Sequence, residues 1–359
     1  MEIAVNQKIK LFIINFAINF IWTIDCVLGF SSKVYAKATL ISILLFLITF
    51  YIPGTPTNQK LMAISKKYSY LSDYFYENFA HRNKLLSAQV LGAQSAKINY
   101  PYLASALEMP AISAKSAVVI DKASGKTLFE LNKNLHLAPA STTKLMTALV
   151  SLDLYNLTDY LSVPYLCTLS ESQKIGFTVD SNVRVRDLLI GLLVGSGGDS
   201  ACALSVGKVS TNEFVDLMNK KAKELGMENT QFTNPVGLDG AHFSTADDLY
   251  KLAHYATENE VIKNIVKLKN IDIPILNLDG TNTNISVVST NKLLWDIKGS
   301  IGIKTGKTEA AGEVLVYEYN NDKLDKDIVI IVMGSQDRFL DTQNLLFWTL
   351  KSYKWEKDS

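Results

Sequence analysis

Residues 138 to 149 read Ala-Pro-Ala-Ser-Thr-Thr-Lys-Leu-Met-Thr-Ala-Leu, and the interpretation of the whole chain starts from this stretch. It places Ser141 and Lys144 at the start of an apolar run, a pattern that predicts the beginning of a helix. Because residues three apart share one face of a helix, we expect the Lys144 amine beside the Ser141 hydroxyl. A serine hydroxyl needs an adjacent base to act as a nucleophile, and Lys144 supplies that base if it is neutral part of the time.

The same spacing of serine and lysine recurs at Ser289 and Lys292, so the motif is informative only in its context. Ser289 follows a β-branched run from Ile285 to Val288 instead of opening an apolar helix. We therefore interpret Ser289 as a structural serine and Ser141 as the candidate nucleophile.

Two further polar clusters follow in the order that a single site requires. Ser196 begins a Ser-Gly-Gly loop after a predicted helix, and Lys304 begins a Lys-Thr-Gly run in a predicted strand. An S-x-x-K motif followed by a K-T-G strand is the signature of penicillin-sensitive serine enzymes. The glycine of the last cluster, Gly306, lets its strand approach a ligand without a side chain in the way.

The composition excludes several classes of protein. The 359 residues, 48% of them hydrophobic, suffice for a full domain and a membrane segment. Basic and acidic residues nearly balance at 36 to 35, and no basic stripe carries interleaved aromatics, so nucleic acid is not an expected partner. The four histidines form no H-E-x-x-H motif and the cysteines no C-x-x-C spacing, so we expect no metal and no cofactor.

Three cysteines give no disulfide framework. Cys26 lies in the apolar N-terminal region, whereas Cys167 and Cys202 lie in the globular part and are able to pair. Because a buried free thiol behaves as a small apolar side chain, we expect Cys167 and Cys202 to be buried free thiols.

An apolar run from Thr39 to Ile52, followed by Pro53, predicts a membrane anchor, with residues 34–38 extending it toward a full span. Lys33 and Lys37 precede the run, so the positive-inside rule places the following chain outside the cytoplasm. A cleaved signal peptide is the alternative, although no clean A-x-A site follows promptly. Whether residues 11–30 form a second span stays open.

We divide the chain into a membrane-anchoring region (1–57), a stalk or linker (58–105) and a catalytic domain (106–359). Strands at both ends of the last region and helices between them indicate an α+β fold. We expect an antiparallel sheet closed by both chain ends, flanked by helices and interrupted by a helical insert. Because the sequence ends soon after the last predicted helix, no additional β-domain or C-terminal amphipathic anchor is expected. The expected strands are 117–120, 127–131, 301–304, 313–319 and 327–333, and the expected helices are 184–194, 199–206, 211–225 and 340–353.

Residues 138–149 resemble the nucleophile helix of the low-molecular-mass penicillin-binding proteins, the serine-type D-alanyl-D-alanine carboxypeptidases of the peptidase S11 family. The resemblance extends over residues 110–355, and its specificity comes from ordered motifs along this span. The other matching stretches are 214–226, 229–238 (Asn-Thr-Gln-Phe-Thr-Asn-Pro-Val-Gly-Leu), 242–249 (His-Phe-Ser-Thr-Ala-Asp-Asp-Leu) and 304–312 (Lys-Thr-Gly-Lys-Thr-Glu-Ala-Ala-Gly).

This resemblance implies a fold shared with serine β-lactamases, a periplasmic or outer-surface site, and peptidoglycan stem peptides ending in D-Ala-D-Ala as substrates, with β-lactams as inhibitors. It implies that Ser141 attacks the carbonyl between the two terminal D-alanines, with Lys144 as base. Burial and the nearby Lys304 cation would both lower the pKa of Lys144. Ser196 would relay a proton toward the leaving amine.

The resemblance also implies how the substrate is held. Lys304 and Thr305 would bind its terminal carboxylate, next to Gly306, and Arg338 is a candidate second contact for that carboxylate. The oxyanion hole would consist of the backbone N–H groups of Ser141 and Lys307.

One position departs from the family pattern. The middle motif of the family is S-x-N, but here the third residue is Gly198. An asparagine would hydrogen-bond the substrate amide and help to fix the base lysine, and glycine has no side chain for either task. A water or a neighbour such as Asp199 or Ser200 would then fill the gap, and Gly198→Asn would leave activity unchanged or raise it.

Three alternatives to a carboxypeptidase remain at this point. A β-lactamase is disfavoured, because Glu228 and Asn229 are too close together for the Glu-to-Asn spacing of class A enzymes and Glu224 lies on a predicted helix. An endopeptidase that cuts peptidoglycan crosslinks uses nearly the same chemistry. A non-catalytic cell-wall-binding protein would keep the groove but have lost turnover with Gly198.

Overall fold

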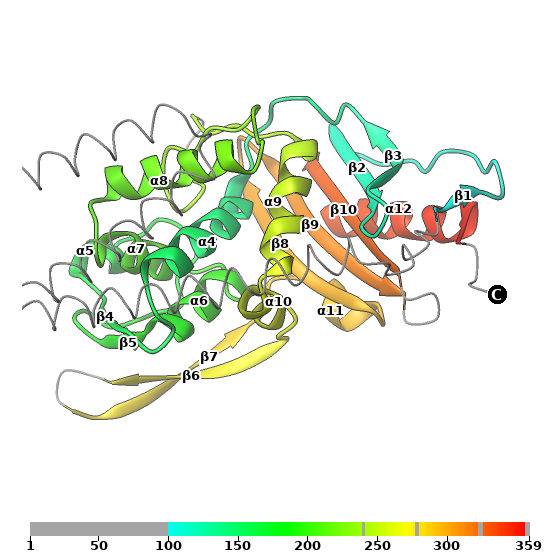
Figure 1. Ribbon diagram of the computed structural model, residues 1–359. Coiled ribbons are helices and arrows are strands. Elements are labelled where there is room, and N and C mark those ends of the chain that lie inside the picture. Colours follow the sequence, from blue (N-terminus) through cyan, green and yellow to red (C-terminus); the bar gives the residue numbers. More distant parts are fainter. Residues whose placement is uncertain (1–99, 239–240, 277–279, 322–325, 356–359) are drawn as a thin grey trace, which may run out of the picture. The chain divides into compact units, whose positions relative to one another are not determined.

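The computed structural model describes residues 100–238, 241–276, 280–321 and 326–355 (Figure 1). The predicted anchor and nearly all of the predicted stalk lie outside these residues. Within the part that is described, no helix is long and apolar enough to cross a membrane. The end of the predicted stalk contributes a short strand, β1 (Tyr102–Leu103), which pairs antiparallel with β11 (Tyr353–Lys354).

A five-stranded antiparallel sheet, in the order β3-β2-β10-β9-β8, forms the centre of the fold. The hairpin of β2 (Ser116–Asp121) and β3 (Lys126–Leu131) comes from the N-terminal side of the described chain. The C-terminal strands β8 (Ser300–Thr308), β9 (Gly312–Asn321) and β10 (Lys326–Ser335) complete the sheet, and β10 pairs directly with β2. The predicted antiparallel sheet that both chain ends close is confirmed.

Both faces of this sheet are buried, because alternate residues of a strand point to opposite faces. On β10, Val329, Ile331 and Met333 join the core shared with the helical insert. The intervening Ile328, Ile330 and Val332 join a second core, under helix α12 (Arg338–Ser352). This double burial explains why the strand reads as a continuous apolar run. Figure 1 shows α9 (Ala246–Glu258) in front of the sheet and α12 behind it.

The segment between β3 and β8 forms the helical insert. Its helices are α4 (Lys144–Leu154), α5 (Tyr165–Thr168), α6 (Val185–Leu193), α7 (Gly198–Val206), α8 (Thr211–Glu224), α9, α10 (Glu260–Val266) and α11 (Leu293–Asp296). Polar side chains cap several of them: the Ser210 hydroxyl accepts from the Glu213 N–H at the start of α8, and Thr245 does the same for α9. The starts of these helices are therefore encoded locally.

The predicted long helices agree with α6, α7, α8 and α12 to within one or two residues at each end. The sequence predicted Ser141 at the start of an apolar helix. In the structure Ser141 lies in a 3₁₀ turn (Ala140–Thr143), and the α-helix α4 begins after this turn. A four-stranded sheet in the insert was not predicted. Its members are β4 (Tyr160–Ser162), β5 (Asn182–Arg184), β6 (Asn270–Leu276) and β7 (Asn282–Val288).

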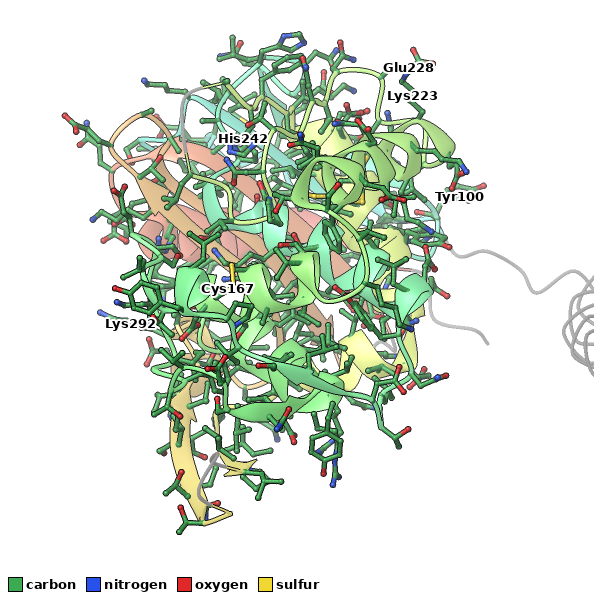
Figure 2. All side chains as sticks on the ribbon, turned by 90° about the vertical axis from the view of Figure 1, so that its left-hand side faces the viewer. Tyr100, Cys167, Lys223, Glu228, His242 and Lys292 are labelled. Carbon is green, nitrogen blue, oxygen red and sulfur yellow. A yellow bond between two sulfur atoms is a disulfide. The ribbon has the colours of Figure 1, made fainter. Side chains whose placement is uncertain are left out.

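The prediction that Cys167 and Cys202 are free thiols is wrong, because they form a disulfide (Figure 2). Cys167 lies in α5 and Cys202 in α7, and these two helices pack side by side. Their Cα atoms are 5.3 Å apart, within the range that a disulfide spans. The residues are 35 positions apart, so the pairing follows from the packing of the helices and not from sequence spacing.

Candidate active site

The nucleophile candidate lies on a constrained turn. Ala140, just before Ser141, has a φ of 48°, a left-handed conformation that is uncommon for a residue with a side chain. Ser141 is partly exposed, whereas Lys144 is completely buried beneath it. The Lys144 Nζ lies 2.9 Å from the Ser141 Oγ and donates to the Val236 carbonyl at 2.7 Å. The structure therefore brings hydroxyl and amine together as the three-residue spacing predicted.

Burial lowers the pKa of Lys144, so that its amine is able to act as a base. Removal of the ammonium from water lowers the pKa of Lys144 from 10.5 to about 7, while the Asp199 carboxylate acts in the opposite direction. Close to neutral pH the amine is thus uncharged for a large part of the time. The expected lowering by Lys304 is not among the causes: burial alone lowers this pKa.

A second serine and lysine form the other half of the site. Ser196 is buried, has a φ of 60°, and accepts a hydrogen bond from the Lys304 Nζ at 2.8 Å. Lys304 also donates to the Thr305 carbonyl at 3.0 Å. Burial, followed by the charges of Lys144 and Arg338, holds the pKa of Lys304 well below its usual value. Both pairs belong to one cluster, because β8, which carries Lys304, packs against the turn that carries Ser141.

Gly306 explains how β8 reaches the nucleophile turn. A Cβ atom at this position would lie 2.9 Å from the Ala140 Cβ and 3.0 Å from the Ser141 N. Any larger residue would therefore push β8 away from the turn. The need for glycine comes first from packing against Ser141, whereas the sequence had suggested an approach to the ligand.

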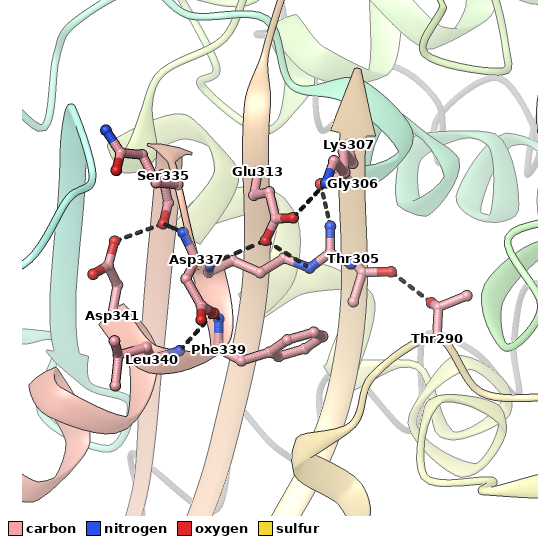
Figure 3. A network of polar contacts seen from close by, with 12 residues as sticks. Thr290, Thr305, Gly306, Lys307, Glu313, Ser335, Asp337, Phe339, Leu340 and Asp341 are labelled. Carbon is pink, nitrogen blue, oxygen red and sulfur yellow. Dashed lines mark hydrogen bonds and ion pairs between the residues drawn. The ribbon is translucent and has the colours of Figure 1, made fainter. Parts of the chain in front are cut away.

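The other predicted binding residues lie on β8, the strand of Lys304 (Figure 3), or, in the case of Arg338, at the start of α12. The Thr305 hydroxyl lies 2.5 Å from the Thr290 hydroxyl, and Arg338 donates from Nη1 to the Gly306 carbonyl at 2.8 Å. Lys307 is exposed, and its side chain pairs with Glu313 at 2.8 Å. Glu313 also accepts from the Arg338 N–H at 3.2 Å, so it links the strand to the start of α12.

Sequence reasoning missed the loop that holds the base. The carbonyl of Val236 accepts from Lys144, and Asn234 Oδ1 shapes this loop by accepting from the N–H groups of Val236 and Gly237 at 3.0 and 2.9 Å. A Cβ atom on Gly237 would collide with the Ala140 carbonyl. The Asn-Pro-Val-Gly sequence at 234–237 is a turn signal, but no signal in it points to Lys144.

The space beside Gly198 is filled. A Cβ atom there would collide with the Ser170 Oγ and lie 2.7 Å from the Ser172 Oγ. Asp199 does not fill this space, because its carboxylate accepts from the N–H groups of Ile175 and Gly176. An asparagine at position 198 would therefore require Ser170 and Ser172 to shift, and the expectation that Gly198→Asn leaves activity unchanged or raises it stays a prediction.

The fold and the site together define a serine acyl-transfer protein of the penicillin-binding class, with a serine–lysine pair at a helix start and a lysine on a sheet strand. The model of the family D-alanyl-D-alanine carboxypeptidase, Peptidase S11, matches residues 103–337. The chain belongs to this family.

Individual relatives agree with this assignment. The chain is 35% identical to the D-alanyl-D-alanine carboxypeptidase DacF of Bacillus subtilis over 205 residues, which is 55% of this chain and 52% of that protein. It is 31% identical to a D-alanyl-D-alanine endopeptidase of Pseudomonas aeruginosa, over 74% of this chain and 88% of that protein. The chain thus spans about half the length of DacF.

A solved structure shares the fold. The crystal structure of the Streptomyces K15 DD-transpeptidase superposes with a TM-score of 0.65 and 29% sequence identity, over 68% of this chain and 100% of that chain. The predicted penicillin-binding fold, with antiparallel strands and flanking helices, is confirmed for the described residues.

Proposed function

We propose that this protein is a serine D-alanyl-D-alanine carboxypeptidase that removes the terminal D-Ala from peptidoglycan stem peptides. The observation that carries the proposal is the buried Lys144 amine, 2.9 Å from the Ser141 hydroxyl and with a pKa of about 7. A neutral amine next to a hydroxyl is what a serine nucleophile requires. Family membership supplies the substrate class.

In the acylation step, the Ser141 Oγ attacks the carbonyl carbon between the two D-alanines while its proton passes to Lys144. The N–H groups of Ser141 and Lys307 stabilise the oxyanion, a contribution worth about 3 to 4 kcal/mol per donor. Ser196, linked to Lys304, relays the proton from Lys144 to the leaving nitrogen, so that Lys144 is neutral again. The C–N bond breaks, D-Ala leaves, and an ester to Ser141 remains.

In the deacylation step, water attacks the ester carbonyl and gives its proton to the neutral Lys144 amine. The bond between the acyl carbon and the Ser141 oxygen then breaks, and the proton returns to that oxygen. The products are the shortened peptide with a free carboxylate and the regenerated serine.

Lys304, Thr305 and Arg338 are the proposed contacts of the substrate carboxylate. Lys304 is completely buried and its pKa is low, so an anion next to it offsets the penalty of burying the charged amine. Arg338, the first residue of α12, is held against the same strand by its hydrogen bond to the Gly306 carbonyl. Binding of the anionic peptide end would thus raise the pKa of Lys304 and favour its charged ammonium form.

The test is release of D-Ala from diacetyl-Lys-D-Ala-D-Ala by the full-length chain, with Ser141→Ala as the inactive control. Release by the parent and none by the control supports the proposal. Binding of the peptide without release would instead identify a non-catalytic cell-wall-binding protein.

An endopeptidase is the second candidate, because the Pseudomonas relative with that name matches 88% of its own length. The two activities separate on purified peptidoglycan: a carboxypeptidase releases free D-Ala, whereas an endopeptidase converts crosslinked dimers to monomers. We expect D-Ala release to be the faster reaction.

We further propose that residues 1–57 anchor the protein in the cell membrane with the catalytic domain outside the cytoplasm, where it acts in cell wall organisation and cell shape. The Cys167–Cys202 disulfide supports this location, because disulfides persist in oxidising compartments. Protease treatment of intact spheroplasts tests it: digestion of the catalytic domain is expected, and complete protection would exclude this orientation.

A further inference from the structure

Two serine hydroxyls from a distant segment occupy the place where a side chain at position 198 would lie. A Cβ atom on Gly198 would collide with the Ser170 Oγ and would lie 2.7 Å from both the Cβ and the Oγ of Ser172. Both serines belong to the segment 169–174, between α5 and β5. The volume beside Gly198 is thus already lined with hydroxyl groups.

The disulfide fixes the beginning of segment 169–174. Cys167 lies two residues before it, and its bond to Cys202 ties α5 to α7, the helix that begins at Gly198 (Figure 2). The segment therefore cannot move away from α7 at this end without breaking a covalent bond.

Backbone hydrogen bonds fix the other end of the segment. The Gln173 carbonyl accepts from the Gly198 N–H at 2.7 Å. The Asp199 carboxylate accepts from the N–H groups of Ile175 and Gly176 at 3.0 and 2.8 Å. All of these contacts are to the first turn of α7, which begins two residues after Ser196. The segment that carries the two hydroxyls is therefore fixed to this helix.

Ser170 and Ser172 keep most of their hydrogen-bonding capacity. The Ser170 Oγ accepts from the Ser172 N–H at 3.4 Å, and the Ser172 Oγ donates to the Gln173 carbonyl at 3.3 Å. Both distances exceed those of ordinary hydrogen bonds, and a hydroxyl offers one donor and two acceptor positions. Both side chains are partly exposed, so a ligand is able to reach them.

We propose that Ser170 and Ser172 bind the peptide backbone of the substrate and replace the side chain that Gly198 lacks. Their hydroxyls hydrogen-bond the amide group that precedes the scissile bond, because a hydroxyl pairs with either a carbonyl or an N–H and needs no charge. This assignment rests on the proposed function and names further residues that hold the same substrate.

The experiment measures binding without turnover. Ser141→Ala serves as the parent, and the dissociation constant of diacetyl-Lys-D-Ala-D-Ala is measured by calorimetry with and without Ser170→Ala/Ser172→Ala. Loss of two hydrogen bonds should raise the dissociation constant about tenfold. In the active chain, the same double variant should raise KM more than it lowers kcat, since the contacts are made in ground state and transition state alike.

Glu171→Ala is the matched control, because Glu171 lies between the two serines and its side chain is exposed. It should change the dissociation constant by less than about twofold, which lies below the loss of one hydrogen bond. Thermal melting is recorded for every variant, and a double variant that does not fold is replaced by the two single serine variants.

A dissociation constant that is unchanged in folded serine variants, or that rises equally in Glu171→Ala, would overturn the assignment. Failure of the proposed function looks different: the unmutated chain, with Ser141 intact, would then bind the tripeptide but release no D-Ala. Binding in the Ser141→Ala background separates the two outcomes.

Discussion

Two serine–lysine pairs form the candidate site, and the chain brings them together in different ways. Ser141 and Lys144 are three residues apart, with hydroxyl and amine at 2.9 Å. Ser196 and Lys304 are 108 residues apart, at 2.8 Å. One helical turn creates the first pair, whereas the second exists only after the insert has packed against β8. The second pair therefore depends on every contact that holds the Ser196 loop.

The largest effect is expected from breaking the local pair. Ser141→Ala removes the nucleophile, so labelling by a fluorescent penicillin should disappear and D-Ala release should fall by more than about a thousandfold. Ser289→Ala is the matched control, since Ser289 begins another S-x-x-K spacing, and it should leave labelling intact. Persistent labelling of the Ser141→Ala protein on a gel would exclude Ser141 as the nucleophile.

The next prediction concerns the Cys167–Cys202 disulfide, which ties α5 to α7, the helix that follows Ser196. Cys167→Ser/Cys202→Ser opens a covalent loop of 35 residues, and the free energy of unfolding should fall by about 3 to 4 kcal/mol. Urea unfolding measures this change, with Cys26→Ser as the control outside the bridge. If the double variant is as stable as its parent, the disulfide does not hold the insert together.

The pH dependence of kcat/KM tests whether Lys144 is the base. The base must be uncharged, and the pKa of Lys144 is about 7, so kcat/KM should fall roughly tenfold for each pH unit below 7 and level off above it. Rates of acylation between pH 5 and 9 measure the profile. A rise that continues to pH 9 would show that Lys144 keeps a pKa near its usual value and is not the base at neutral pH.

Gly198→Asn tests how tightly segment 169–174 packs beside the Ser196 loop. Because Ser170 and Ser172 fill the space, the larger residue must displace segment 169–174, and the free energy of unfolding should fall by about 1 to 3 kcal/mol. Gly125→Asn is the control, because nothing lies within 4 Å of a Cβ atom there, and asparagine tolerates its left-handed φ of 68°. Equal melting temperatures of the two variants would mean that the segment yields freely.

The smallest effect is expected at Thr290, which contacts Thr305 on β8. Thr290→Val removes the hydroxyl that lies 2.5 Å from the Thr305 hydroxyl, so Thr305 should lose its orientation toward the substrate carboxylate. A threefold to tenfold rise in KM follows from the loss of one hydrogen bond of about 1 kcal/mol. Steady-state kinetics with the tripeptide measure it. An unchanged KM would remove Thr290 from substrate binding.

The elements that the sequence predicted well are those with a local signal. The continuous apolar run of β10 and the capped start of α8 arise within a few residues of the chain. The spacing of Ser141 and Lys144 is of the same kind, because a helical turn converts three positions into contact.

The features that the sequence did not predict all depend on long-range contacts. The Val236 carbonyl binds an amine 92 positions earlier in the chain, and Cys167 meets Cys202 only because α5 packs on α7. The filled space beside Gly198 has the same origin, as segment 169–174 comes from outside the motif. Residues 1–57 lie outside the described structure, so the membrane anchor stays a prediction.

The order of strands in the sheet has a consequence for how the chain folds. The hairpin of β2 and β3 is synthesised early, yet its neighbour β10 is the last strand of the sheet to leave the ribosome. Until then the apolar side chains of β2 have no partner strand on that edge. Pairings between such remote segments form slowly, and the waiting edge invites aggregation. A chaperone that shields this hairpin during synthesis would therefore favour the yield of native protein.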